Sequence, residues 1–150
     1  MNFKSRNVDD TYRLAKVIAN TLNGGDIVLL NGDLGAGKTT FVKGIAKEMG
    51  VKENVTSPTF TLLKTYHGNK YNIVHVDAYR LSGDEFGELD DYLNDENVIF
   101  IEWSSMLTSQ LINNALLIDI KYISKNQRMF TISATNAHYE SYLSEIRENV

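Results

Sequence analysis

The stretch "VLLNGDLGAGKTTFVKG", Val28 to Gly44, is the most informative part of this chain. Gly32 to Thr39 fits the pattern G-x-x-x-x-G-K-[ST], with an apolar run before it and helical spacing after it. Glycines let the backbone curl so that several amide N–H groups converge on phosphates, and the following helix N-terminus adds positive potential. The stretch predicts a phosphate-binding loop, and its flanks argue against a chance match in a turn that begins a helix.

The loop residues receive separate roles. Lys38 is expected to reach the β and γ phosphates of a nucleotide, and the Thr39 hydroxyl to bind Mg²⁺. We predict that contacts to the nucleotide come from the whole loop: Gly32, Asp33, Leu34, Gly35, Ala36, Gly37, Lys38, Thr39 and Thr40.

A loop of this kind also needs a carboxylate nearby to orient Mg²⁺ and the attacking water. The run "VIFIEW", Val98 to Trp103, delivers Glu102 to the end of a buried strand, where ligands of open α/β sheets bind. Asp77, at the end of "YNIVHVD", is a second candidate. For both carboxylates, the alternative is a strand-end acid that merely faces solvent. We predict Lys38, Asp77 and Glu102 as catalytic residues, and Glu102 also as a metal-binding residue together with the loop threonine.

The nucleotide is predicted to be ATP. A GTPase would carry the guanine-binding sequence Asn-Lys-x-Asp after a strand. The nearest string, Asn69 to Asn72, lacks the aspartate and falls in a predicted hairpin. The match "DEFG", Asp84 to Gly87, to the pattern Asp-x-x-Gly does not follow an apolar strand. Both strings are interpreted as accidental.

Strand and helix patterns alternate along the chain and predict an α/β fold. The sequence predicts a P-loop NTPase-like mixed β-sheet sandwiched between helices, with antiparallel hairpins at the margins. We expect one domain over residues 1–150. The expected helices are 9–22, 39–49, 82–93 and 137–147, and the expected strands are 26–30, 98–103, 115–123 and 128–135, with a hairpin over 61–80.

Composition excludes several classes of protein. The net charge of -4 argues against a protein that binds nucleic acid alone by neutralising phosphates. The chain has no cysteine, so it contains neither disulfides nor thiolate metal sites. It has no uninterrupted apolar segment typical of a signal peptide or a membrane span, so the expected location is cytoplasmic, without membrane contact.

Four motifs in order carry a resemblance to a known family: "GDLGAGKTT", "TSPTF", "HVDAYRL" and "IEW". Together they resemble the TsaE family, formerly YjeE, the ATPase component of bacterial tRNA threonylcarbamoyladenosine synthesis. The resemblance implies an ATP-hydrolysing switch, required for threonylcarbamoyl modification of the tRNA adenosine adjacent to the anticodon. It also implies a Mg²⁺-dependent ATPase, weak alone, that acts on TsaD and TsaB and reaches tRNA only through that complex.

The resemblance also assigns residues. It implies that Lys38 and Thr39 contact phosphate and Mg²⁺, that Glu102 is the carboxylate of the Mg²⁺ site, and that Asp77 matters for activity. Thr11 matches the family's N-terminal position near the nucleotide.

Two further positions follow from the motifs and the C-terminal strand pair. Trp103 is included among the nucleotide contacts, with an ordinary core position as the alternative. The string "SKNQR", Ser124 to Arg128, lacks the Gly-Arg pair often seen in that hairpin of similar proteins, so Arg128 is not assigned to the nucleotide.

Other readings stay open. The segment Thr56 to Thr59 is either a switch ordered by the γ-phosphate or a rigid turn shaped by Pro58. His75 has no cysteine or second histidine at ligand spacing, so a core or hydrogen-bonded histidine is favoured over a zinc ligand.

The alternative function is a small-molecule kinase that transfers the γ-phosphate to a bound acceptor. The chain has five arginines and no evident arginine-rich lid for such an acceptor.

Overall fold

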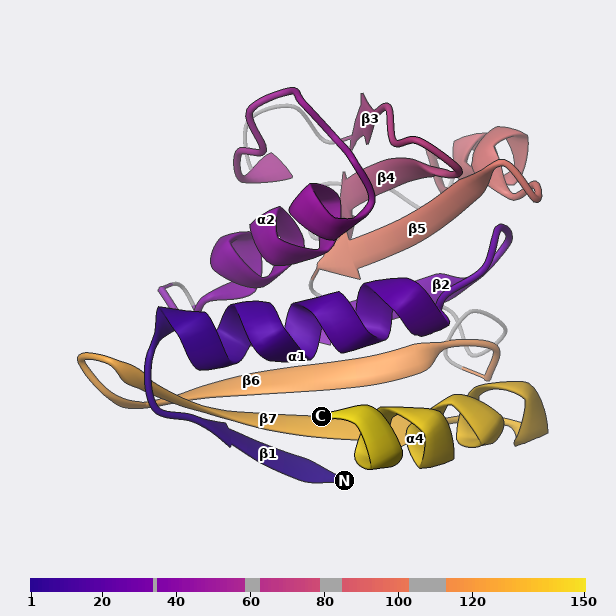
Figure 1. The fold of residues 1–150 in the computed structure, drawn as a ribbon. Coiled ribbons are helices and arrows are strands. Elements are labelled where there is room, and N and C mark those ends of the chain that lie inside the picture. The colour runs from indigo at the N-terminus through magenta and orange to yellow at the C-terminus, as the bar shows by residue number, and fades with distance from the viewer. Residues whose placement is uncertain (34, 59–62, 79–84, 103–112) are drawn as a thin grey trace.

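A computed structural model describes residues 1–33, 35–58, 63–78, 85–102 and 113–150, which form one seven-stranded sheet with helices packed on it (Figure 1). The elements in chain order are β1 (Asn2–Ser5), α1 (Val8–Thr21), β2 (Ile27–Asn31), α2 (Lys38–Glu48), β3 (Leu63–Tyr66), β4 (Asn72–Asp77), the 3₁₀-helix η3 (Glu85–Tyr92), β5 (Asn97–Glu102), β6 (Leu116–Ser124), β7 (Gln127–Ala134) and α4 (Ala137–Asn149).

The sheet is mixed, as the sequence predicts. Its strand order is β1-β7-β6-β2-β5-β4-β3. The four central strands β6, β2, β5 and β4 run parallel to one another. At the margins, β3 pairs antiparallel with β4, and β7 pairs antiparallel with both β6 and β1. The carboxyl ends of the central strands therefore meet at one edge of the sheet, which lies at the left in Figure 1.

The two faces of the sheet are covered differently. Side chains alternate between the faces along each strand, so Val28 and Leu30 of β2 pack with residues of α1, α2 and α4, whereas Ile27 and Leu29 face the other side. On that second side the sheet packs against Leu89 and Tyr92 of η3. Among the described residues, no helix combines the length and apolar character needed to cross a membrane.

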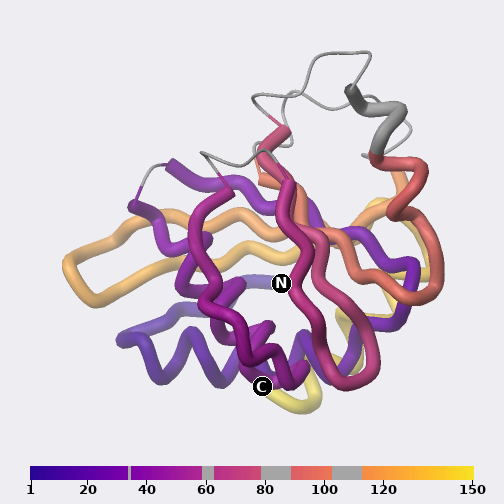
Figure 2. The backbone as a smooth tube through the Cα atoms, turned by 90° about the horizontal axis from the view of Figure 1, so that it is seen from above, coloured from indigo at the N-terminus to yellow at the C-terminus, as the bar shows by residue number. Residues whose placement is uncertain are grey.

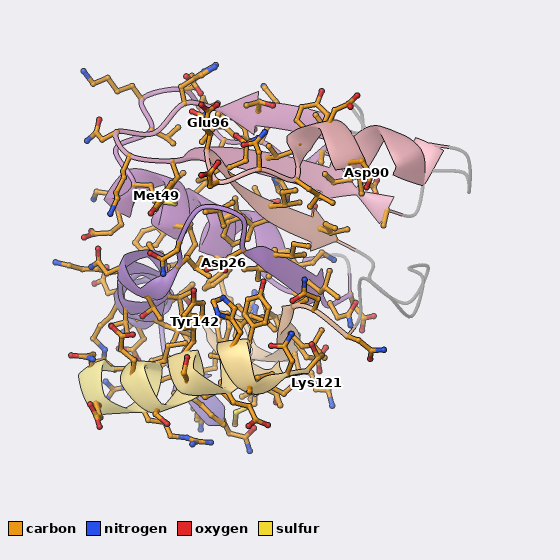
Figure 3. The ribbon with its side chains drawn as sticks, turned by 90° about the vertical axis from the view of Figure 1, so that its right-hand side faces the viewer. Asp26, Met49, Asp90, Glu96, Lys121 and Tyr142 are labelled. Atoms are coloured by element: carbon orange, nitrogen blue, oxygen red, sulfur yellow. The ribbon has the colours of Figure 1, made fainter. Side chains whose placement is uncertain are left out.

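Helix α4 is attached to the sheet by a polar contact at the start of β2. The buried carboxylate of Asp26 accepts hydrogen bonds from Tyr142 Oη at 2.6 Å and from His138 Nε2 at 2.9 Å (Figure 3). Tyr139 Oη accepts from the backbone N–H of Ile27 at 3.0 Å, and burial raises the pKa of Tyr139 to about 12. These bonds satisfy buried polar groups at the amino end of β2, on the opposite side of the sheet from the carboxyl ends of the central strands.

Two elements differ from the sequence-based expectations. Strand β1 was not predicted. It consists of four residues, too few to show the alternating pattern of a strand, and it is held by backbone pairing with β7. The helix expected over 82–93 is a 3₁₀-helix in its described part, and residues 82–84 lie outside the described residues. In a 3₁₀-helix, positions i and i+3 share one side, which brings Leu89 and Tyr92 together against the sheet.

Gly44 lies where α1 and α2 pack together. A Cβ at this position would lie 2.8 Å from both Ala15 Cβ and Tyr12 Cδ1, which is too close for packed carbon atoms. We therefore expect Gly44→Val to lower the free energy of unfolding by about 1–3 kcal/mol, the usual effect of overpacking, measured by urea unfolding. Lys43→Val, on the exposed side of α2, is the matched control. Equal losses in the two variants would contradict the packing argument.

Candidate functional site

The loop between β2 and α2 has the geometry of an anion site. Gly37 begins the helix with φ at +111°, a left-handed conformation that favours glycine, and no side chain of the described residues caps it. A Cβ on Gly32 would come within 2.8 Å of the Ile120 backbone oxygen. The first turn of α2 carries no acidic residue. A helix N-terminus with these features is suited to bind an anion.

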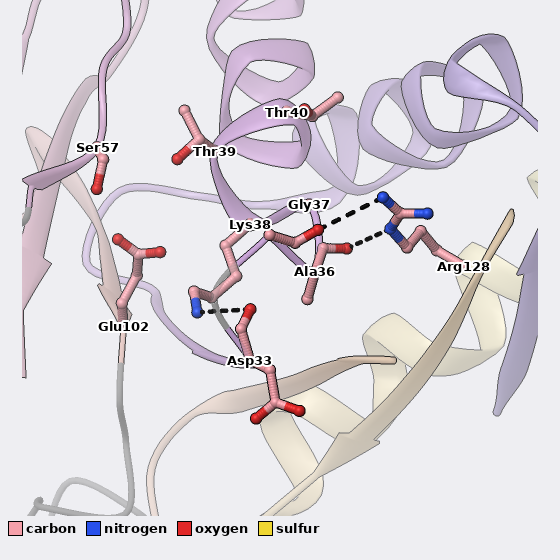
Figure 4. A pocket seen from close by; sticks show the side chains of 10 residues that line it. Asp33, Ala36, Gly37, Lys38, Thr39, Thr40, Ser57, Glu102 and Arg128 are labelled. Atoms are coloured by element: carbon pink, nitrogen blue, oxygen red, sulfur yellow. Dashed lines mark hydrogen bonds between the residues drawn. The ribbon is translucent and has the colours of Figure 1, made fainter. Parts of the chain in front are cut away.

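The loop forms one wall of a cavity of about 270 Å³ (Figure 4). The other walls come from the end of β5, from the segment that precedes β3 and from the β6–β7 hairpin. The residues that line the cavity are Asp33, Gly35, Ala36, Gly37, Lys38, Thr39, Thr40, Ser57, Glu102 and Arg128.

Lys38 brings a positive charge into this cavity, although the residue is only 8% exposed. Its Nζ donates to the backbone oxygen of Gly32 and, at 3.5 Å, to that of Asp33. Burial lowers the pKa of the Lys38 amine from its ordinary value. Three carboxylates oppose this shift: Glu102, Asp33 and Asp77. The amine is thus surrounded by backbone oxygens and negative side chains.

Two of those carboxylates end neighbouring parallel strands. Asp77 is the last residue of β4, Glu102 is the last residue of β5, and the two are direct partners in the register of the pair. Both are buried, with exposures of 2% and 3%. Glu102 lines the cavity, whereas Asp77 lies beside it on the next strand. The structure therefore brings together the two strand-end carboxylates that the sequence singled out.

The oxygen donors around the cavity suit a hard cation. The Thr39 hydroxyl, the Ser57 hydroxyl and the Glu102 carboxylate lie around the same space (Figure 4). Mg²⁺ prefers oxygen ligands and usually takes only one or two from the protein, with phosphates and water completing its shell. Thr39 and Glu102 fit that requirement. No group of three histidine, aspartate or glutamate side chains able to hold a metal ion occurs in the described part of the chain.

Arg128 reaches the loop from the β6–β7 hairpin. Strand β6 pairs with Asn31 of β2 at Asp119 and continues to Ser124, so the hairpin extends past the central strands, at the left in Figures 1 and 2. The returning strand β7 carries Arg128, whose Nε donates to the Ala36 backbone oxygen at 2.8 Å. Its guanidinium lies 4.7 Å from the centre of the Tyr122 ring. The hairpin thus places a second cation beside the loop.

A second, smaller cavity of about 80 Å³ lies next to the first. It shares Gly37, Thr40 and Arg128 with the first cavity and also contacts Thr11 of α1. Thr11 is buried there, and its hydroxyl lies 2.7 Å from the hydroxyl of Ser5. The N-terminal helix therefore contributes to the wall of a space next to the phosphate-binding loop.

The predicted site residues can now be located. Most of the loop and Glu102 line the first cavity, Thr11 lines the second, Gly32 lies at the base of the loop, and Leu34 and Trp103 lie outside the described residues. Sequence reasoning did not include Ser57 and Arg128 among the site residues. The hydroxyl-rich string around Ser57 was a usable signal. No local pattern places Arg128 there, because its position depends on how far β6 extends.

Comparison with known proteins identifies related sequences. A family model described as "Threonylcarbamoyl adenosine biosynthesis protein TsaE" matches residues 5–130. The chain is 36% identical to the Bacillus subtilis tRNA threonylcarbamoyladenosine biosynthesis protein TsaE over 148 residues, which covers 97% of this chain and 93% of the relative. Identity to the Rickettsia felis protein of the same name is 42% over 141 residues, or 91% and 81% of the two chains.

A solved structure is also similar. The crystal structure of Bacillus subtilis YdiB superposes with a TM-score of 0.84 and 33% sequence identity, covering 99% of this chain and 94% of that one. The overall α/β architecture predicted from the sequence is thus found in an experimental structure. On these grounds, the chain belongs to the TsaE family of threonylcarbamoyl adenosine biosynthesis proteins.

Proposed function

We propose that this protein is a Mg²⁺-dependent ATPase that serves as a switch subunit in tRNA threonylcarbamoyladenosine biosynthesis. The proposal depends chiefly on one observation: a single cavity joins the phosphate-binding loop, Lys38, Thr39 and the buried carboxylate of Glu102. Family membership supports the pathway. We further propose that the protein acts on TsaD and TsaB and reaches tRNA through that complex, in keeping with its net charge of -4.

The residues would divide the work as follows. The amides of the loop and Lys38 would bind the phosphates, and Thr39 and Glu102 would hold Mg²⁺, which would supply positive charge to neutralise the phosphates. Asp77, the register partner of Glu102, would add a second buried carboxylate at the carboxyl ends of the central strands. The second cavity, with Thr11 in its wall, adjoins the first and is the proposed place for the adenine base of ATP. Cleavage then requires only that water be held in line with the γ-phosphate.

The segment that contains Ser57 is the proposed switch. Ser57 lines the cavity opposite Lys38 and belongs to a different part of the chain from the loop (Figure 4). A segment that contacts the γ-phosphate is ordered while the phosphate is present and released after hydrolysis. Partner subunits would bind the ordered and the released segment differently, so that ATP hydrolysis would be coupled to their reaction.

Phosphate release measured with and without TsaD and TsaB tests the proposal. We expect slow release by the protein alone and faster release with both partners and Mg²⁺. ADP production that depends instead on a small-molecule acceptor, without free phosphate, would support the kinase alternative. Failure of the partners to change the rate would contradict the switch.

Arg128 is expected to strengthen nucleotide binding, because its guanidinium lies beside the phosphate-binding loop. We expect Arg128→Ala to weaken ATP binding by about tenfold, since hydrogen bonds to charged groups contribute roughly 1.5–3 kcal/mol. Isothermal titration calorimetry would measure the change. Arg147→Ala, on α4 and remote from either cavity, is the control. Affinity that is the same in both variants would leave Arg128 with a purely structural role.

A further inference from the structure

A buried histidine lies against the cavity carboxylate. His75 of β4 has an exposure of 0%, and its Nε2 lies 3.2 Å from Oε2 of Glu102. Neither ring nitrogen makes a well-aligned hydrogen bond to any group in the described part of the chain. The contact between His75 Nε2 and Glu102 Oε2 therefore has the distance of a hydrogen bond but not its angular geometry. A small rotation of the ring or of the carboxylate would complete the bond.

The contact follows from the strand register. His75 pairs with Phe100 and Asp77 pairs with Glu102, so His75 and Glu102 are diagonal neighbours on adjacent parallel strands. Residues two apart on a strand share a face, and this face is the one that packs against α2. The imidazole is therefore directed at the carboxylate from the interior, on the side away from solvent.

A polar side chain without bonds in the core lowers stability unless it serves another group. A zinc site does not account for His75, because the described residues contain no cluster of three metal-binding side chains. Hydrophobic packing alone does not require a ring with two nitrogens at this position. Among the described residues around His75, Glu102 has matching chemistry, since an ionised carboxylate accepts hydrogen bonds and an imidazole N–H donates them.

We propose that His75 is a positioning residue for Glu102. It donates its Nε2–H to Oε2, which holds the carboxylate in one orientation and leaves Oε1 for a ligand in the cavity. Outer partners that orient a metal-binding carboxylate typically change metal affinity or activity by about 10–100-fold when removed. This inference rests on the proposed function, because it concerns how well Glu102 supports Mg²⁺ and hydrolysis.

Two substitutions separate hydrogen bonding from packing. His75→Phe keeps a planar ring but removes both nitrogens, whereas His75→Gln places an amide nitrogen near the position of Nε2. Ile73→Val, on the same strand and the same face but remote from Glu102, is the control for a small loss of core packing. Urea unfolding would show that each variant is folded.

ADP affinity is measured by calorimetry in EDTA and at increasing Mg²⁺, and hydrolysis is measured in the same Mg²⁺ series. We expect His75→Phe to need about 10–100-fold more Mg²⁺ for half-maximal hydrolysis, with ADP affinity in EDTA unchanged. His75→Gln is expected to recover most of the Mg²⁺ response, and Ile73→Val to retain it fully. A merely structural role would lower both measurements together and would not be rescued by glutamine.

The tautomer of His75 gives a readout that does not depend on activity. The chain has three histidines, and His67 and His138 are exposed, so ¹⁵N spectra of the wild type and His75→Gln identify the buried ring. We expect the proton on Nε2. A proton on Nδ1 with Nε2 bare would overturn the inference, whatever the hydrolysis rates.

The possible failures are distinguishable. If the wild type binds nucleotide equally with and without Mg²⁺, the proposed function fails and this inference fails with it. If the wild type depends on Mg²⁺ and His75→Phe shows the same dependence, the proposed function stands and only the positioning role is overturned.

Discussion

Replacing Lys38 with alanine is expected to weaken ATP binding by about 100-fold or more, since losing one partner of a buried charge pair costs about 2–5 kcal/mol. The physical reason is the location of the amine. Lys38 lines the cavity, its Nζ is held by the Gly32 and Asp33 backbone oxygens, and the residue is 8% exposed. The β and γ phosphates would take over those contacts. Calorimetric titration with ATP in the presence of Mg²⁺ measures the loss.

The fold is expected to survive this change. The amine contacts the loop and the cavity, whereas the core of α2 is made by Phe41, Val42 and Ile45. Lys43→Ala removes the same charge from an exposed position of the same helix and should leave the affinity unchanged. Wild-type affinity in Lys38→Ala would mean that the loop does not bind phosphates. A loss in Lys43→Ala of the same size would point to a general charge effect.

Glu102→Gln is expected to lower Mg²⁺-dependent hydrolysis by about 100-fold or more while ATP affinity measured in EDTA stays close to that of the wild type. Glutamine has nearly the same shape, so the substitution removes the negative charge from the end of β5 without opening space in the core. The loop amides and Lys38 remain to bind phosphates. Single-turnover phosphate release and calorimetry, carried out on the same preparation, test the two halves of this expectation.

Glu96→Gln provides the matched control, since Glu96 is exposed just before the amino end of the same strand. It should leave both hydrolysis and binding unaltered. If Glu102→Gln instead loses nucleotide binding in EDTA together with hydrolysis, Glu102 has a structural role in the cavity. The pair Lys38→Ala and Glu102→Gln therefore separates binding of the nucleotide from its use.

Much of this molecule could be inferred from local order in the chain. The string from Gly32 to Thr39 specifies its own conformation, because glycines permit the turn and the apolar runs on either side have the periods of a strand and a helix. The carboxylates Asp77 and Glu102 end two apolar strands, and parallel strands bring such ends to one edge. The central sheet and the core of the site follow from these short-range patterns.

Contacts between distant segments required the three-dimensional structure. Strand β1 is visible only through its pairing with β7, and Arg128 lies beside the loop only because β6 continues past the end of β2. The approach of His75 to Glu102 depends on the relative register of two strands separated by a 3₁₀-helix. The amino-acid sequence shows which face of a strand is apolar, because side chains alternate between the two faces. It does not record strand register or the extension of a hairpin, since these are set by packing over the whole sheet.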